Sequence, residues 1–367
     1  MDNGCVVDIS RDRHGRKRIS VDFDQISRIL LRRRTNIRSL SMALEMAKST
    51  VHRRITEGSI KAHSNRLKPY LTEENKKSRL MFCTSIIDQG TVNSKPTFTD
   101  IYDCVHIDEK WFYMSKTSKK YYLHPLENEP LRTCKNKRFI EKVIFLVAVA
   151  RPRITSTNQE FLGKIGIFPF NFKEPAKRNS KNRIAGTLET KAIKNVTKDV
   201  IRKYLIEKIL PSIREKWPEN SSKIIYIQID NAKPHISVND DEFLRAGRKD
   251  GFDIRLSFQP SNSPDLSILD LGFFRAIQIL QHQQAPTTID ELILAVEKSY
   301  NDLPSEDLNC VFLTLKSCMV EIMKVFGGFD YKIPHMNKNK LKKDGRLPIR
   351  LECDPEVFNK AMAYLQN

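Results

Sequence analysis

Three aspartates in or beside apolar segments are the residues of this sequence best suited to chemistry. Asp108 interrupts a β-type segment at 104–113, Asp230 ends the apolar run 224–229, and Asp270 lies in an amphipathic helical pattern. Burying a carboxylate is costly unless it is paired or binds a cation. We therefore expect the three side chains to act together, as metal ligands and as catalytic residues.

Grouped carboxylates repel one another, so they either take up protons or hold divalent metal. Oxygen ligands select Mg²⁺ or Mn²⁺ over zinc. Two such ions about 4 Å apart can activate a water or a 3′-hydroxyl and stabilise the leaving oxygen in phosphoryl transfer. Taken singly, each aspartate is more often a turn or capping residue, so this prediction depends on the three together.

Three further polar residues stand next to the predicted ligands in the sequence: Glu109, Asn231 and His235. Such neighbours can orient metal ligands through hydrogen bonds. A packing role is an equal alternative for each of them.

A sheet and a helix must position the aspartates. Strands are predicted at 104–113, 121–123, 142–150, 224–229 and 252–259, and a helix at about 191–216. A second helix should begin with Ser263 as its N-cap and place Asp270 on its core-facing side. Residues 151–189 read as an irregular basic insertion containing Phe168, Phe170 and Phe172. That composition suits a nucleic-acid surface or an ordinary long loop.

Near the N-terminus, two short helical patterns are separated by a turn at 45–47. This arrangement predicts a helix-turn-helix, whose second helix enters a DNA major groove, although any small helical bundle could show it. Glu45 occupies a turn position where glycine is common. Ser49 or Thr50 is expected near the cap of the second helix. The residues predicted to bind DNA are Lys48, Ser49, Thr50, His52, Arg53 and Arg54.

The composition favours a polyanionic partner. The chain of 367 residues has a net charge of +19, and nucleic acid is a commoner partner than a membrane surface for such a protein. Seven dispersed cysteines argue against a zinc site or a disulfide scaffold. No secretory segment is evident, and the longest apolar run, 143–150, is too short to span a bilayer. We expect a soluble intracellular protein without membrane contact. The basic cluster at 11–18, within the arm 1–18, could be a nuclear address, a phosphate contact or an ordinary solvated tail.

The three aspartate segments resemble the catalytic blocks of mariner-type transposases of the DDE/D superfamily, most closely the plant and protist branch. Between Asp230 and Asp270 there are 39 residues, the D-D-(39)-D spacing of that branch. The matching blocks are His106–Phe112, Asp230–His235 and Asn262–Phe274. Other family-like segments are Lys164–Gly166, Ser180–Arg183, Ala185–Lys191 and Tyr331–Met336.

This resemblance implies an α/β fold, in which an all-α helix-turn-helix domain precedes a ribonuclease-H-like catalytic domain with a mixed sheet flanked by helices. It implies two Mg²⁺ ions, or Mn²⁺, on Asp108, Asp230 and Asp270. The partners implied are double-stranded DNA, as terminal inverted repeats and as a TA target, and further copies of the chain in a homodimer or larger assembly. The implied location is nuclear. The region before the helix-turn-helix is short for a family that usually has two DNA-binding subdomains.

The sequence divides into five predicted regions. They are a basic flexible arm (1–18), the helix-turn-helix domain (19–60), a linker and connecting helix (61–95), the catalytic domain (96–285) and a C-terminal helical region (286–367). Two other functions stay open. One is a domesticated or inactive descendant that binds DNA as a regulator, against which the complete set of aspartates argues. The other is a structure-selective nuclease, which would cleave DNA without joining strands.

Overall fold

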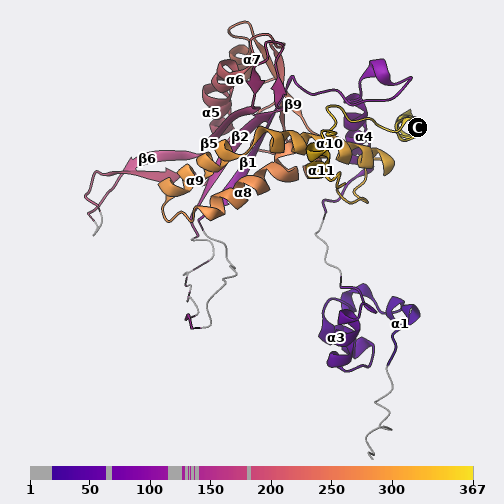
Figure 1. The fold of residues 1–367 in the computed structure, drawn as a ribbon. Helices are drawn as coiled ribbons and strands as arrows, with labels where there is room; N and C mark the ends of the chain where they lie inside the picture. The colour runs from indigo at the N-terminus through magenta and orange to yellow at the C-terminus, as the bar shows by residue number, and fades with distance from the viewer. Residues whose placement is uncertain are drawn as a thin grey trace, which may run out of the picture. The chain divides into compact units, whose positions relative to one another are not determined.

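The computed structural model describes residues 19–62, 68–114, 140–179 and 183–366, with 126–128, 131, 133 and 136. The chain forms two compact units, which divide between Lys68 and Pro69 (Figure 1). The predicted arm at 1–18 and the predicted strand at 121–123 lie outside the described residues. Helix α4 (Glu73–Ser85), which the sequence placed in a connecting region, belongs to the second unit.

The first unit is a small helical bundle. Its elements are α1 (Phe23–Ser27), the 3₁₀ turn η2 (Leu31–Arg33), α2 (Ile37–Ala43) and α3 (Lys48–Thr56). The Asn36 side chain caps α2 by accepting a hydrogen bond from the amide of Ser39 at 2.9 Å. Helix α3 begins at Lys48 with Ser49 and Thr50 in its first turn, near the cap as expected, and its N-cap is Ala47, which makes no side-chain capping bond. The two predicted helices and the turn between them are confirmed.

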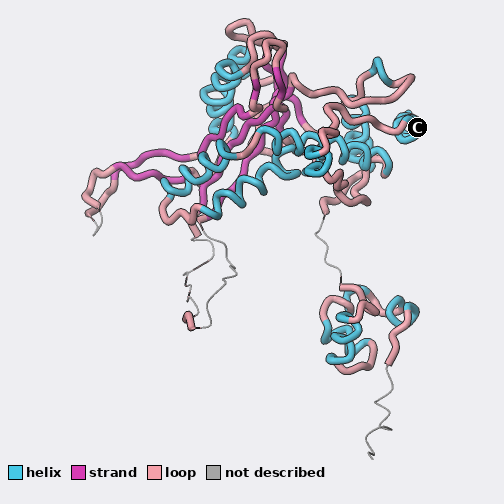
Figure 2. Tube along the Cα trace, in the orientation of Figure 1, coloured by secondary structure: helices cyan, strands magenta, loops and turns pink. Residues whose placement is uncertain are grey.

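The second unit is built on a five-stranded mixed sheet in the order β5-β2-β1-β8-β9. Strand β1 is antiparallel to β2, β2 is antiparallel to β5, and β1, β8 and β9 run parallel. Helices cover both sides of the sheet (Figure 2), so the expected α/β architecture is confirmed. The bounds are β1 (Cys104–Tyr113), β2 (Lys142–Ala150), β5 (Lys164–Pro169), β8 (Ile224–Ile229) and β9 (Asp253–Phe258).

Two hydrophobic cores lie on opposite faces of this sheet. Strand β2 contributes alternate residues to each: Val143, Phe145, Val147 and Val149 to one core and Ile144, Leu146, Ala148 and Ala150 to the other. Alternation with both faces buried is expected of a central strand. The first core also contains α4, α8 (Phe274–Gln283), α9 (Ile289–Asp302), α10 (Ser305–Lys324) and α12 (Pro355–Gln366). The second contains α5 (Lys198–Tyr204), the π-turn η5 (Leu205–Ile209), α6 (Leu210–Lys216) and α7 (Asp241–Gly247).

The prediction of an irregular insertion at 151–189 is wrong. It contains β3 (Arg153–Ile154) paired with β4 (Glu160–Phe161), the sheet strand β5, and the hairpin β6 (Asn171–Pro175) with β7 (Leu188–Ala192). Phe170 is buried and Phe168 packs against the second core, so of the three phenylalanines only Phe172 is exposed. Because β7 occupies residues up to 192, the following helix begins at Lys198 and not near 191.

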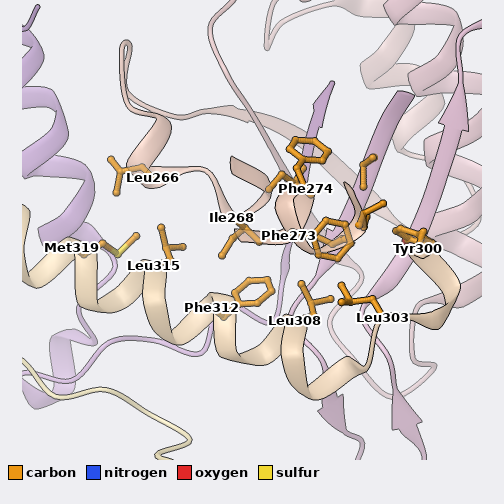
Figure 3. Packing of buried hydrophobic residues seen from close by; sticks show 14 of the residues in the cluster. Leu266, Ile268, Phe273, Phe274, Tyr300, Leu303, Leu308, Phe312, Leu315 and Met319 are labelled. Atoms are coloured by element: carbon orange, nitrogen blue, oxygen red, sulfur yellow. The ribbon is translucent and has the colours of Figure 1, made fainter. Parts of the chain in front are cut away.

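The C-terminal residues share the first core with the sheet. Figure 3 shows Leu308, Phe312, Leu315 and Met319 on one face of α10, directed toward the segment 266–274. The 3₁₀ turn η3 (Gln89–Thr91) and the short helix α11 (Lys338–Lys343) also belong to the second unit. Among the helices that the structure describes, none has the length and hydropathy to cross a membrane.

Lys316 is an exception within this apolar environment. Its side chain on α10 is fully buried, and within the described part of the chain its ammonium has no hydrogen-bond partner. The nearby Asp100 carboxylate is already bonded to Arg151 at 3.1 Å and to Arg350 at 2.8 Å. Burial, with a smaller contribution from the Arg151 charge, lowers the pKa of Lys316 to about 7.

Candidate active site

The strand register brings two of the predicted ligands level with each other. In the parallel pair β1 and β8, the last matched residues are His106 and Gln228. Asp108 and Asp230 each lie two residues further along their strands, so they are level at the point where the chains separate. Adjacent strands are about 4.8 Å apart. The register therefore places both carboxylates at the carboxyl end of β8.

The charged form of the Asp108 side chain is destabilised by burial and by neighbouring carboxylates. Burial raises the pKa of this carboxyl to about 8, and the negative charges of Asp270, Glu109 and Asp230 add to the shift. The effects of Asp270 and Asp230 on Asp108 show that both of these residues lie within electrostatic range of Asp108. A carboxyl that is protonated near neutral pH among other carboxylates gains its charge readily when a cation binds there.

His235 joins two of the acidic residues. Its Nδ1 lies 2.7 Å from Asp230 Oδ1, and its Nε2 lies 3.2 Å from both carboxylate oxygens of Glu109. Burial disfavours the charged ring, but these hydrogen bonds outweigh it and raise the pKa of His235 to about 10. Partial burial also opposes ionisation of Asp230, and the bond to His235 nevertheless holds the pKa of that carboxyl below its usual value. The orienting interpretation of Glu109 and His235 fits these contacts.

The segment that carries Asp270 is not the continuous helix predicted from Ser263. A 3₁₀ turn, η6 (Pro264–Leu266), is followed by extended backbone at Ser267 and then by the π-turn η7 (Leu269–Phe273). Ser263 makes no capping bond, and its hydroxyl bonds to the Ser261 carbonyl instead. The break turns Asp270 outward, so its side chain is 38% exposed and its predicted core-facing position is wrong.

Two residues that the sequence analysis did not single out contact these carboxylates. The Ser267 hydroxyl donates to Asp108 Oδ2 at 3.3 Å and accepts from the amide of Asp270 at 3.4 Å. Lys110 Nζ lies 3.5 Å from Asp270 Oδ1. Lys110 could have been found from the sequence, because it lies two residues after Asp108 on the same face of β1. Ser267 could not, because its position depends on the break in the helix.

A buried ion pair anchors this segment. Arg79 of α4 is fully buried, and its two terminal nitrogens donate to the two oxygens of Asp265 at 2.7 Å each. The Tyr331 hydroxyl also bonds to Asp265, and Arg79 Nε donates to the Gly327 carbonyl at 2.8 Å. A bidentate pair whose remaining donors are satisfied fixes geometry strongly. It therefore holds η6, and with it Ser267, against α4.

The donor chemistry fits a hard divalent cation, although the ligands are not gathered as they stand. Oxygen-only donors from Asp108, Asp230 and Asp270 suit Mg²⁺ or Mn²⁺. Among the described residues, no three acidic, histidine or cysteine side chains are close enough together to enclose one ion. Asp230 is directed toward His235 and Asp270 toward Lys110. To hold an ion together with Asp108, these two carboxylates would have to turn away from His235 and Lys110.

The predicted DNA-binding residues of α3 do not all face outward. Lys48, Ser49, His52 and Arg53 are exposed and Thr50 is half-buried, but Arg54 is buried. Arg54 Nε donates to the Ile19 carbonyl at 2.8 Å, and its guanidinium pairs with Glu57. Arg54 therefore stabilises the unit from within, and its predicted outward position is wrong. Asn231 is exposed beside Asp230.

The backbone of the turn between α2 and α3 shows why glycine is common at the position that Glu45 occupies. This residue has φ of +53°, the left-handed conformation that glycine adopts most readily. The turn thus has the backbone typical of a helix-turn-helix in spite of its sequence.

The sheet order, with Asp108 within β1 and Asp230 just after the adjacent parallel strand β8, defines a class of fold: a mixed sheet flanked by helices, with carboxylates at the carboxyl end of a central strand. No protein-family model and no curated protein sequence matches the chain. Solved structures of the Mos1 mariner transposase share its fold. A pre-cleavage Mos1 transpososome has a TM-score of 0.58 at 16% identity, covering 88% of this chain and 84% of that chain. The Mos1 paired-end complex with Mn (TM-score 0.56, 17% identity) and the Mos1 strand transfer complex (TM-score 0.56, 16% identity) each cover 88% of this chain and 83% of theirs.

Proposed function

We propose that the protein is a cut-and-paste DNA transposase that binds terminal inverted repeats and catalyses metal-dependent strand cleavage and strand transfer. The observation that supports this best is the placement of Asp108 and Asp230 at one level of adjacent strands, with Asp270 in electrostatic range. The fold shared with Mos1 transposase structures and the basic face of α3 in the first unit agree with it.

In this proposal, Asp108, Asp230 and Asp270 hold two divalent ions, Mg²⁺ or Mn²⁺. Solved Mos1 paired-end complexes contain either metal. The ions supply activation of a water or a 3′-hydroxyl and stabilisation of the leaving oxygen. The chain's own residues then orient the ligands: Ser267 fixes Asp108 relative to the Asp270 backbone, and Glu109 acts through His235 on Asp230.

The proposed partners are two copies of the transposon end and a target with a TA dinucleotide. Solved Mos1 structures include paired-end and strand transfer complexes, and bringing two ends together is most simply done by a homodimer or a larger assembly. The exposed residues Lys48, Ser49, His52 and Arg53, with the half-buried Thr50, are proposed to contact DNA. We also propose a nuclear location, because the proposed substrate would be chromosomal DNA.

The test replaces each aspartate by asparagine, which keeps its size and removes its charge. Asp108→Asn, Asp230→Asn and Asp270→Asn should each abolish Mg²⁺-dependent cleavage of DNA carrying the element's own ends, while binding to those ends is retained. Asp290→Asn, at an exposed position on α9, is the matched control and should cleave normally.

The outcomes separate the remaining alternatives. Cleavage that persists in one of the three variants removes that residue from the proposed site. Binding by the wild-type chain with no cleavage in either metal would indicate a DNA-binding regulator. Cleavage without strand joining would indicate a structure-selective nuclease.

A further inference from the structure

A groove lies beside Asp230, at the carboxyl ends of the parallel strands β8 and β9. Its volume is about 430 Å³. One wall is formed by a single face of α4 that includes Met81, Phe82 and Ser85. The other is formed by Asn231 after β8 and by Phe258 and Gln259 at the end of β9. Ligands of open α/β sheets commonly bind at this edge, outside the carboxyl ends of the strands.

The side chains of the groove suit a flat, uncharged ligand with polar edges. No charged residue is among the described side chains that line it, so it offers nothing to neutralise a phosphate. Phe82 and Phe258 provide aromatic surface, and Met81, which is 59% exposed, provides a polarisable thioether. Asn231 and Gln259 provide amide groups, which pair well with the edges of bases. This combination of stacking surface and amides is the chemistry that recognises a nucleobase.

Hydrogen bonds on the protein side of the groove link its two walls through η6. Arg79 lies on α4 between the groove residues Ser78 and Met81, and it is directed into the protein, where it pairs with Asp265 of η6. Gln228 of β8 also donates to Gln259 at 3.3 Å and to the Leu266 carbonyl at 3.2 Å. A site whose walls are fixed before binding loses little entropy when a ligand enters. The groove is therefore preorganised.

We propose that this groove, the base groove, binds one unpaired nucleobase of the DNA strand that is processed at the neighbouring aspartates. This inference rests on the proposed function, because DNA is the substrate that brings bases to Asp230. Stacking on Phe82 or Phe258 and hydrogen bonding to Asn231 need a base whose face and edge are both free, and a base paired and stacked within a duplex has neither free. The base groove thus holds a strand that has separated from its complement, and the aspartates lie where the backbone of that strand passes.

The experiment uses the full chain and a DNA duplex with a short single-stranded overhang carrying one 2-aminopurine. Stacking of this fluorescent base on an aromatic ring quenches it, so wild-type protein should quench the probe. Phe82→Ala should abolish the quenching and weaken binding of the overhang about fivefold or more, and Phe82→Trp should restore both. A plain duplex without an overhang should bind equally well to all three proteins.

A second pair of variants covers the case in which Phe82→Ala fails to fold. Met81→Ala removes an exposed side chain from the base groove and should reduce quenching. Leu294→Ala removes a side chain of similar exposure, 64%, on α9 outside the groove and should leave quenching unchanged. Equal quenching by wild type, Met81→Ala and Leu294→Ala, or binding of the probe without quenching, would overturn the proposal. Metal-dependent cleavage, measured on the same proteins, reports separately on the proposed function.

Discussion

Replacing the buried Lys316 by methionine should make the protein more stable at neutral pH. Lysine here occupies a fully buried position on α10, and its ammonium has no hydrogen-bond partner within the described part of the chain. Methionine has a similar length and keeps the contacts of the methylene groups. The substitution therefore removes the cost of burying an amine while it changes the packing little.

The magnitude follows from the pKa. Burial and the charge of Arg151 lower the pKa of Lys316 from 10.5 to about 7. At neutral pH this difference corresponds to a cost on the order of 4 kcal/mol in the free energy of unfolding. Methionine will not match the site perfectly, so we expect Lys316→Met to gain ~2 kcal/mol.

The effect of Lys316→Met on stability should also depend on pH, in a direction that follows from the lowered pKa. Between the folded pKa near 7 and the unfolded pKa of 10.5, the unfolded chain binds more protons than the folded chain, so the stability of the wild type rises with pH. The cost is fully present below pH 7 and disappears above 10.5. The advantage of Lys316→Met should therefore shrink as the pH is raised from neutral toward 10.

Urea unfolding followed by tryptophan fluorescence measures this effect, because Trp111 and Trp217 both belong to the second unit. The control is Lys298→Met, which replaces an exposed lysine on α9 and should change stability little at any pH. If Lys316→Met is less stable than wild type near pH 7, or if its advantage does not depend on pH, then the buried amine is not destabilising as argued.

Three further predictions concern the first unit. Glu45→Gly should stabilise this unit by ~1 kcal/mol, because residue 45 has a φ of +53°, which is strained for a residue with a side chain but not for glycine. Slower amide hydrogen exchange in α2 and α3 would show this stabilisation, and unchanged exchange would contradict it. Arg53→Ala should weaken DNA binding and reduce the slope of log affinity against log salt by roughly one. Arg54→Ala should instead speed amide exchange in α3, since it removes buried bonds to the Ile19 carbonyl and Glu57; a loss of salt slope with normal exchange would return Arg54 to the DNA-binding face.

The hydrophobic pattern of the sequence was sufficient to predict those strands and helices whose environment is determined by residues of the same segment. The apolar run before Asp230 predicted β8 and its end, and the eight residues of β2 from Val143 to Ala150 are all buried as a central strand requires. The helix pair around Glu45 was also predictable, because amphipathic spacing survives an unfavourable turn residue.

Tertiary contacts decided the features that the sequence did not reveal. Asp265 lies in the helix predicted to begin at Ser263, but its carboxylate pairs with Arg79, 186 positions away, and the backbone is extended at Ser267. Arg54 looked like a basic surface residue until the carbonyl of Ile19, 35 positions away, proved to be its partner. Strand β5 carries a glycine and a proline, and only its pairing with β2 makes it a strand.

The register between β1 and β8 determines which changes in chain length the site can tolerate. Inserting one residue between His106 and Asp108 would turn the Asp108 side chain to the opposite face of the sheet, because side chains alternate along a strand. The 39 residues between Asp230 and Asp270 include α7, β9 and the turns around them, where added residues can form longer loops without moving either carboxylate. The two residues that separate each aspartate from the last matched strand position must therefore be kept for the carboxylates to stay together. The long intervals between the aspartates can change in length, because they consist largely of connecting chain.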